Sequence, residues 1–176
     1  MKKQFFHKII FLFSCASVAG YIWEVTLTYV RTGVFCNRGF MYGPWLPIYG
    51  VGDLFLLFLL YRFAGRPIIV FFLSGIIGSF VELITGLALN RYWDVRYWDY
   101  SGLKLDLAGY ISFISFLGFC IAGALWVCIL VPLLYRVWEY IPTLARRASV
   151  LLFCTVFFID YIYSLFCPNT GVGITF

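Results

Sequence analysis

Acidic side chains interrupt the apolar stretches of this chain, and three of them could do chemistry together. A fourth, Asp160, stands alone in the last apolar run, with either a structural or a proton-linked role. Glu24 and Glu82 lie within long apolar runs, and Asp53 follows Pro47 by six residues at the start of another run. An ionisable side chain inside a membrane costs about 3 kcal/mol or more and usually faces a cavity or a partner. Paired buried carboxylates could also perform acid–base chemistry on a lipid headgroup. These three residues are therefore candidates for function.

The two glutamates occur in matching contexts 58 residues apart. Each belongs to the pattern small-xxx-Gly-xxx-Glu-xxx-small, and an arginine follows each glutamate by fourteen residues. Residues four apart share one helix face, so each glutamate is expected on a stripe of small residues that faces other helices. The pattern predicts a parallel repeat of two-helix units, with common small-residue packing as the alternative. Its two copies are Ala16, Gly20, Glu24, Thr28, Arg38 and Ser74, Gly78, Glu82, Gly86, Arg96.

A second polar stretch, RYWDVRYWDYS at residues 91–101, repeats YWD with a five-residue step. Aromatic rings with one polar edge are favoured at the membrane interface, which accounts for the Tyr and Trp residues. It does not account for Asp94 and Asp99, which alternate with Arg91 and Arg96. These charges could form a local ladder of salt bridges or the polar rim of a pocket. We favour the rim.

The segment NRGFMYGPWLPIYGVGD, residues 37–53, separates two apolar runs and carries four glycines and two prolines. Backbone without regular helix is tolerated at membrane depth only where protein or a water-filled cavity covers it. We interpret this Gly/Pro segment as one that bends into the membrane from outside and forms a pocket wall. Gly39 and Gly43 would supply bends, and Pro44 and Pro47 would start the next helix. The alternative is an ordinary glycine-rich turn anchored at the interface by its aromatic side chains.

The composition places these residues in a membrane protein. The chain has 176 residues, of which 63% are hydrophobic and 12% charged, whereas soluble domains have about 25% charged residues. Apolar runs of about 20 residues, enough to cross the hydrocarbon layer, recur along its length. We expect an all-α, polytopic membrane helix bundle that forms a single integral domain over residues 1–176. Five transmembrane spans are predicted, at about 9–30, 46–63, 67–89, 108–135 and 148–166.

The basic residues predict the orientation of these spans. Eight Lys and Arg residues lie on the side of the N-terminus and five on the other side, so the N-terminus is expected in the cytoplasm and the C-terminus outside the cell membrane. The first apolar run continues to Val30, so a retained helix is expected there rather than a signal peptide. With a rise of about 1.5 Å per residue, Glu24 and Glu82 lie about 8 Å below the outer surface and Asp53 about 9 Å below it. The three carboxylates would share one level.

Enzyme and cofactor signatures are not found in the sequence. It contains no GxGxxG, GxxxxGK[ST], HExxH or GxSxG motif, so ATP hydrolysis would require another subunit. His7 is the only histidine and no CxxC pair occurs, so we expect neither a metal site nor a cofactor. The net charge of +5 comes from basic residues scattered at the ends of apolar segments, which does not favour nucleic-acid binding.

Several motifs together resemble the CmpB-type family of putative ABC-transporter permeases, small multi-pass membrane proteins with animal transmembrane relatives. They are GYIWE at 20–24, NRGFMYGPWLPIYGVG at 37–52, GSFVELITG at 78–86, WDYS at 98–101, and a glycine at 109. The resemblance covers residues 17–125 and implies transport without naming a substrate. The motif positions that it carries over are Glu24, Arg38, Gly39, Gly43, Pro44, Pro47, Tyr49, Gly50, Glu82, Trp98, Asp99, Tyr100 and Gly109.

Two positions depart from the family pattern. Asp106 stands where the family tends to have asparagine, and Tyr110 stands where it tends to have arginine. The change adds a negative charge and removes a positive one. The family's ligand contacts therefore need not hold at these two positions.

The first functional hypothesis is a small permease or a membrane-embedded substrate-binding subunit. Its outward-facing polar pocket would be lined by carboxylates, with arginines as counter-charges or anion contacts. In the alternative, Glu24 and Glu82 only pair with Arg38 and Arg96 and so hold the helices together. Five spans are few for a complete path, so a homodimer, or a separate ATPase and permease subunit, is expected. The rival hypotheses are an enzyme acting on lipid or lipid-linked substrates at the outer leaflet, and a non-transporting assembly or sensor protein. The predicted substrate-binding or pocket residues of the first hypothesis are Glu24, Arg38, Gly39, Gly43, Pro44, Tyr49, Asp53, Glu82, Arg96, Trp98, Asp99, Tyr100 and Asp106.

Overall fold

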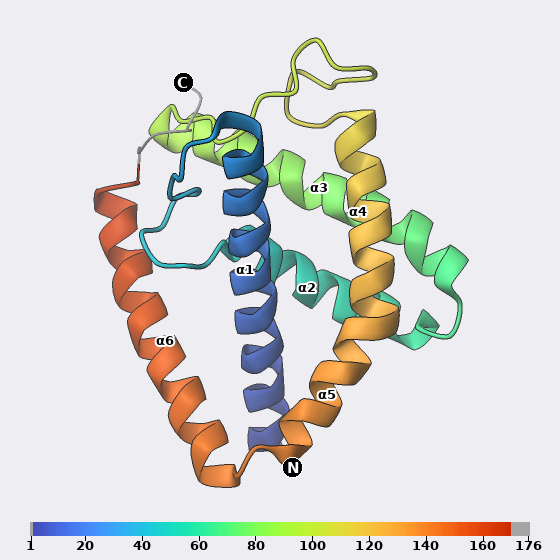
Figure 1. The fold of residues 1–176 in the computed structure, drawn as a ribbon, viewed down its shortest axis with the longest axis vertical. Coiled ribbons are helices and arrows are strands. Elements are labelled where there is room, and N and C mark those ends of the chain that lie inside the picture. Colours follow the sequence, from blue (N-terminus) through green and yellow to red (C-terminus); the bar gives the residue numbers. More distant parts are fainter. Residues whose placement is uncertain (1, 170–176) are drawn as a thin grey trace. The chain divides into compact units, whose positions relative to one another are not determined.

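The computed structural model describes residues 2–169, and this part of the chain is built from helices (Figure 1). The predicted fold class, a helical membrane bundle, is confirmed. The α-helices are α1 (Lys2–Thr32), α2 (Pro47–Leu60), α3 (Pro67–Trp93), α4 (Phe113–Leu125), α5 (Val131–Tyr140) and α6 (Thr143–Phe166). A 3-10 turn, Tyr61–Phe63, follows α2, and a π-helical turn, Trp126–Leu130, joins α4 to α5.

Within residues 2–169, four helical stretches are long and apolar enough to cross a membrane. They cover residues 4–32, 67–93, 113–140 and 143–166, with mean hydropathies of 1.6, 2.2, 2.5 and 1.9. The remaining predicted span, 46–63, contains α2, which has 14 residues. At a rise of about 1.5 Å per residue α2 is about 21 Å long, less than the hydrocarbon thickness of about 30 Å. The predicted span 108–135 begins later, at Phe113, because the preceding residues form turns.

The described residues form two compact units. The first comprises residues 2–50 and 136–169, and the second comprises residues 51–135. The core of the first unit contains the buried side chains of Met41, Trp45 and Phe157. Three further phenylalanines, from α1, the Gly/Pro segment and α6, pack against this core: Phe13, Phe40 and Phe153.

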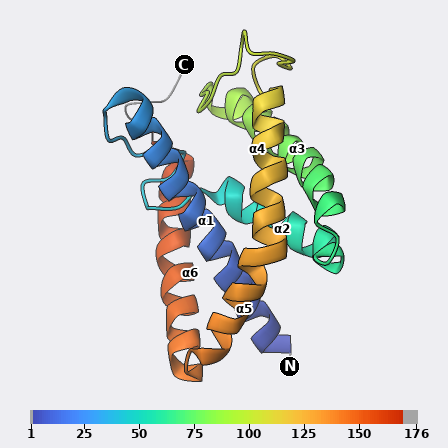
Figure 2. The same ribbon diagram turned by 45° about the vertical axis from the view of Figure 1, so that its right-hand side comes forward.

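Helices α3 and α4 pack along each other in the second unit (Figure 2). The small residues of α3 allow this approach, since a Cβ atom at Gly78 would lie 2.7 Å from Cβ of Phe119. A Cβ atom at Gly86, farther along the same stripe, would lie 2.7 Å from the ring of Tyr110. The stripe of small residues on α3 therefore faces protein, as the sequence pattern predicts.

The π-helical turn has a local cause in the sequence. Pro132 lacks a backbone N–H, and its ring would clash with the carbonyl four residues earlier in a regular α-helix. The helical turn before Pro132 contains one extra residue, so the backbone N–H of Val131 donates to the carbonyl of Trp126, five residues earlier. Such single π-turns inside α-helices occur often at functional sites.

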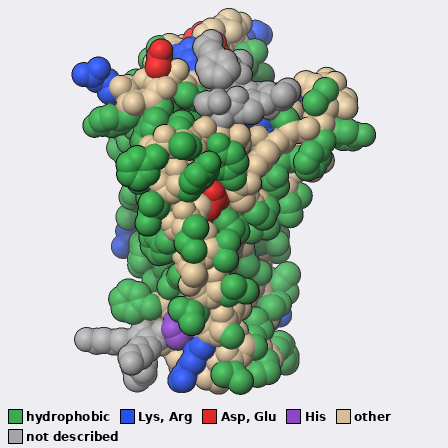
Figure 3. Space-filling model, turned by 90° about the vertical axis from the view of Figure 1, so that its left-hand side faces the viewer, with side chains coloured by type: hydrophobic (Ala, Val, Ile, Leu, Met, Phe, Trp, Pro, Cys, Tyr) green, Lys and Arg blue, Asp and Glu red, His purple; other side chains and the backbone are tan. Residues whose placement is uncertain are grey.

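The surface is strongly apolar, as expected for a protein surrounded by lipid. Hydrophobic side chains make up most of the face drawn in Figure 3. On α6, Leu151, Leu152 and Ile159 are 65–69% exposed.

Candidate functional site

The Gly/Pro segment is held by a carboxylate of α6. Asp160 Oδ1 accepts a hydrogen bond from the backbone N–H of Tyr42 at 3.1 Å, and Oδ2 accepts from the backbone N–H of Gly43 at 2.8 Å. The indole N–H of Trp45 also donates to Oδ2, at 2.8 Å. The hydroxyl of Ser164, one helical turn along α6, lies 3.3 Å from Oδ1. Asp160 thus satisfies the backbone of a segment that lacks regular helix.

Asn169 holds the other side of the same segment. Its backbone N–H donates to the carbonyl of Phe40 at 3.0 Å, and its side-chain amide donates to the carbonyl of Gly39 at 3.1 Å. The same amide lies 3.4 Å from the carbonyls of Asn37 and Met41. The segment is therefore a fixed structure in the first unit, although most of it has no regular secondary structure.

Glycine is required where this segment folds closely on itself. Gly39 has a φ of 98°, in the region that favours glycine, and a Cβ atom there would overlap the side chain of Leu46. A Cβ atom at Gly43 would overlap the indole ring of Trp45. The two bends that the sequence assigns to Gly39 and Gly43 both lie in this tightly packed backbone.

In the first unit, Glu24 is bonded to the start of α2. The hydroxyl of Tyr49 donates to Glu24 Oε1 at 2.7 Å. Gly20, one turn earlier on α1, leaves room for the Tyr49 ring, because a Cβ atom there would overlap it. The backbone N–H of Leu46 also donates to the carbonyl of Ser17 at 3.0 Å. The small residues of α1 thus bring a tyrosine hydroxyl to a carboxylate.

The second glutamate has an equivalent partner in the second unit. Glu82 on α3 is 5% exposed, and the hydroxyl of Tyr100 donates to its Oε1 at 2.9 Å. The sequence patterns that predict a repeat therefore coincide with a shared arrangement, in which each glutamate accepts from the tyrosine of a downstream glycine-containing segment. The resemblance had placed Tyr49 and Tyr100 among the motif residues, but their pairing with the glutamates follows from the structure.

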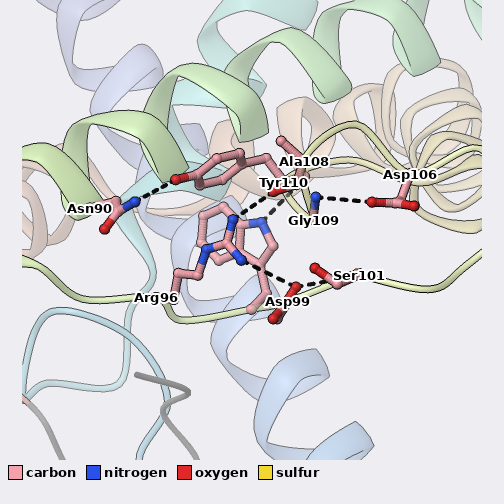
Figure 4. A network of polar contacts seen from close by, with 9 residues as sticks. Asn90, Arg96, Asp99, Ser101, Asp106, Ala108, Gly109 and Tyr110 are labelled. Atoms are coloured by element: carbon pink, nitrogen blue, oxygen red, sulfur yellow. Dashed lines mark hydrogen bonds and ion pairs between the residues drawn. The ribbon is translucent and has the colours of Figure 1, made fainter.

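The loop between α3 and α4 is organised around Arg96 (Figure 4). The Arg96 guanidinium lies 3.3 Å from the Asp99 carboxylate, donates to the carbonyl of Ala108 at 2.6 Å, and stacks 4.4 Å from the centre of the Tyr110 ring. Hydrogen bonds from Ser101, together with the nearby Arg96 charge, hold the pKa of the Asp99 carboxyl below its usual value. This pair belongs to the salt-bridge ladder, which was the alternative to the favoured polar rim.

The two departures from the family pattern both serve this loop. Asp106 Oδ2 accepts from the backbone N–H of Gly109 at 3.2 Å. The Tyr110 hydroxyl accepts from the Asn90 amide at 2.6 Å, and the Tyr110 carbonyl accepts from the Trp98 indole at 3.0 Å. Aspartate and tyrosine therefore have structural partners at these positions. The predicted rim residues Arg91 and Asp94 line an open surface depression of about 450 Å³ nearby.

Asp53 has a partner that the sequence did not reveal. It is 3% exposed, and its Oδ1 accepts from the indole N–H of Trp126, the first residue of the π-helical turn. Trp126 follows Asp53 by 73 residues. The only unusual residue near Trp126 in the sequence is Pro132, which does not indicate a bond to Asp53. Among residues 2–169, no group of three or more His, Cys, Asp or Glu side chains is arranged to hold a metal ion.

The structure distributes the predicted site residues over both units. Direct contacts connect Glu24 with Tyr49, Glu82 with Tyr100, and Arg96 with Asp99. The predicted site residues of the first unit are Glu24, Arg38, Gly39, Gly43, Pro44 and Tyr49, and those of the second are Asp53, Glu82, Arg96, Trp98, Asp99, Tyr100 and Asp106.

Comparison with known proteins supports the resemblance seen in the motifs. Residues 11–165 match the family described as putative ABC-transporter type IV, the CmpB family. Searches of the curated proteins and of the solved structures return no match to this chain. The family match covers most of the chain and includes both glutamates, the Gly/Pro segment and Asp160. The chain therefore belongs to the putative ABC-transporter type IV family.

Proposed function

We propose that this chain is a small permease or membrane-embedded substrate-binding subunit of an ABC-type transporter. Its family and its four apolar helices make it a multi-pass membrane protein related to transport. We place it in the cell membrane as one integral domain, with the N-terminus in the cytoplasm. Because the sequence lacks a phosphate-binding GxxxxGK[ST] loop, ATP hydrolysis is assigned to a separate subunit. A second copy or another permease subunit would complete the path.

The observation that carries this proposal is the repeated pairing of a glutamate in an apolar helix with a tyrosine hydroxyl. Glu24 and Glu82 each use one oxygen for such a bond. A carboxylate kept inside an apolar segment usually marks a substrate or ion pathway. We propose that these polar residues face outward, and that Glu24 in the first unit, and Glu82, Asp53 and Asp99 in the second unit, accept hydrogen bonds from substrate.

The arginines of the proposed site would balance the carboxylates or bind an anionic group of the substrate. In the second unit, Arg96 already pairs with Asp99 and is braced by the Tyr110 ring, so its guanidinium is fixed in position. A planar guanidinium held in this way suits bidentate recognition of a carboxylate or phosphate. Arg38 is assigned the corresponding role in the first unit.

Native mass spectrometry of the gently solubilised protein tests the proposal. We expect a co-purifying solute or an ATPase subunit with the wild-type chain, and loss of that solute in Glu24→Gln and Glu82→Gln variants that remain folded and monodisperse. Tyr92→Phe is the matched control, since Tyr92 is 76% exposed. An altered lipid profile in the two variants would instead favour an enzyme acting on lipid. Variants that fail to fold would favour an assembly or sensor protein in which the glutamates only join helices.

A further inference from the structure

The carboxylate of Asp53 occupies an unusual environment in the second unit. The side chain is 3% exposed, and one oxygen accepts from the Trp126 indole. The other oxygen, Oδ2, is buried and has no hydrogen-bond partner among the described residues. None of the ion pairs formed by residues 2–169 includes Asp53. A buried carboxylate with one neutral donor and no counter-charge is strongly disfavoured in its ionised form.

A second unsatisfied polar atom lies on α3 in the same unit. Ser74 on α3 is 1% exposed, and its hydroxyl has no partner among the described residues. A Cβ atom at Gly123 would contact the Ser74 side chain and would lie 3.6 Å from Leu56. Leu56 and Gly123 are each three residues from the bonded pair Asp53 and Trp126. Since three residues make about one helical turn, Ser74 packs against α2 and α4 about one turn along each helix from its member of that pair.

A titratable tyrosine of the same unit lies within the electrostatic influence of Asp53. Tyr135 on α5 interacts electrostatically with Asp53, and its ring packs edge-on against Tyr61 with 5.6 Å between ring centres. Tyr61 is 37% exposed, so this aromatic pair extends from the surroundings of Asp53 to the surface of the unit.

We propose that Asp53 is a proton-binding site that carries its proton on Oδ2 at neutral pH. On release, the O–H bond breaks, the proton passes to solvent and the electron pair remains on the carboxylate. The ionised carboxylate then needs a second donor, and the Ser74 hydroxyl is the buried group able to supply one. Proton binding at Asp53 does not depend on the proposed function. Only its role does, because we expect proton release at Asp53 to accompany a conformational step of transport.

The π-helical turn is the element through which proton release would act. Trp126 starts this turn and donates the only hydrogen bond that Asp53 accepts from the described residues. A π-turn holds one more residue than the equivalent α-helical turn and occurs often at functional sites. A charge appearing on Asp53 strengthens its bond to the Trp126 indole and thereby changes the packing of residues 126–130.

Infrared spectroscopy of the full chain in lipid bilayers tests the proton directly. We expect the carbonyl stretch of a protonated carboxylic acid at neutral pH, shifted in D₂O, and we expect Asp53→Asn to lack this band. Asp106→Asn is the matched control, because Asp106 lies in an exposed loop, and it should keep the band. Identical spectra of the wild type and Asp53→Asn would overturn the proposal. This readout needs neither substrate nor ATPase, so it stands apart from any failure of the transport assignment.

A second variant keeps the test valid if Asp53→Asn does not fold. Trp126→Phe removes the donor that stabilises the ionised form, so its protonated carboxyl band should persist to higher pH than that of the wild type. A band that disappears at lower pH in Trp126→Phe would contradict the proposal. Hydrogen exchange of residues 126–131 should also change between about pH 6 and about pH 9 in the wild type, after correction for intrinsic rates, and not in Asp53→Asn. Equal changes in both proteins would refute the coupling to the π-turn.

Discussion

The carboxylate of Asp160 on α6 accepts the indole N–H of Trp45 at 2.8 Å, although 115 residues separate the two along the chain. The same carboxylate accepts two backbone N–H groups of the Gly/Pro segment. Trp45 is buried in the core of the first unit against Phe157, one helical turn before Asp160. This contact therefore joins the family's Gly/Pro motif to the last helix.

Replacing Asp160 with asparagine should destabilise the first unit. The amide offers one acceptor oxygen in place of two, and its NH₂ group would face backbone donors. Hydrogen bonds to a charged group contribute about 1.5–3 kcal/mol, so we expect a loss of about 2 kcal/mol or more in the free energy of unfolding. Thermal unfolding in detergent, followed by tryptophan fluorescence, measures it. Asp94→Asn is the control, because Asp94 is exposed, and equal stability of both variants would contradict the assigned role of Asp160.

Gly109 and Gly102 provide a matched pair for the loop between α3 and α4. Both have positive φ angles, 73° and 84°, so alanine is strained at either position. A Cβ atom at Gly109 would also lie 2.6 Å from the Ser101 hydroxyl and 3.1 Å from the Arg96 guanidinium, whereas nothing lies within 4 Å of one at Gly102. We expect Gly102→Ala to cost about 1 kcal/mol of unfolding free energy and Gly109→Ala about 2–3 kcal/mol. Equal costs would show that the Arg96–Asp99 network does not confine Gly109.

Local patterns in the sequence predicted a large part of this structure. The apolar runs predicted the helical membrane bundle, and the spacing of Ser74, Gly78, Glu82 and Gly86 predicted a face turned toward protein. These features depend on helical periodicity, which adjacent residues express directly. The short length of α2 also has a local cause, since Pro47 begins the helix and a 3-10 turn follows Leu60.

Long-range partners could not be predicted in the same way. Asp160 appeared as an isolated acid in an apolar helix, because its donors are backbone groups whose positions depend on the folded Gly/Pro segment. The Trp126 indole offered no sequence signal that it would bond to Asp53. The pairing of each glutamate with a tyrosine was equally hidden, since Tyr49 follows Glu24 by 25 residues and Tyr100 follows Glu82 by 18. Because these two spacings differ, a search for sequence repeats does not find the glutamate–tyrosine contact that both units share.

The two glutamate–tyrosine contacts should differ in strength. Glu82 is buried, whereas Glu24 is half-buried, and a hydrogen bond lost to a buried carboxylate costs more than one lost to a hydrated one. We expect Tyr100→Phe to lower the unfolding free energy by about 2 kcal/mol and Tyr49→Phe by about 1 kcal/mol. A double-mutant cycle of Tyr100→Phe with Glu82→Gln should show a coupling of about 1 kcal/mol. Additive effects would mean that this bond contributes little to stability.

Close packing of α3 on α4 makes opposite predictions for two helical glycines. A Cβ atom at Gly75 would overlap Cys120 and lie 2.7 Å from the Phe116 ring, so Gly75→Ala must push α4 away or displace that ring. We expect it to lose about 1–3 kcal/mol of unfolding free energy. Gly118 is exposed on α4 and has nothing within 4 Å, so Gly118→Ala should gain about 0.5–1 kcal/mol through reduced backbone entropy. Both variants can be compared by thermal unfolding in the same detergent. A stabilising Gly75→Ala would mean that α3 and α4 do not pack this closely, and the stripe of small residues would then lose its structural explanation.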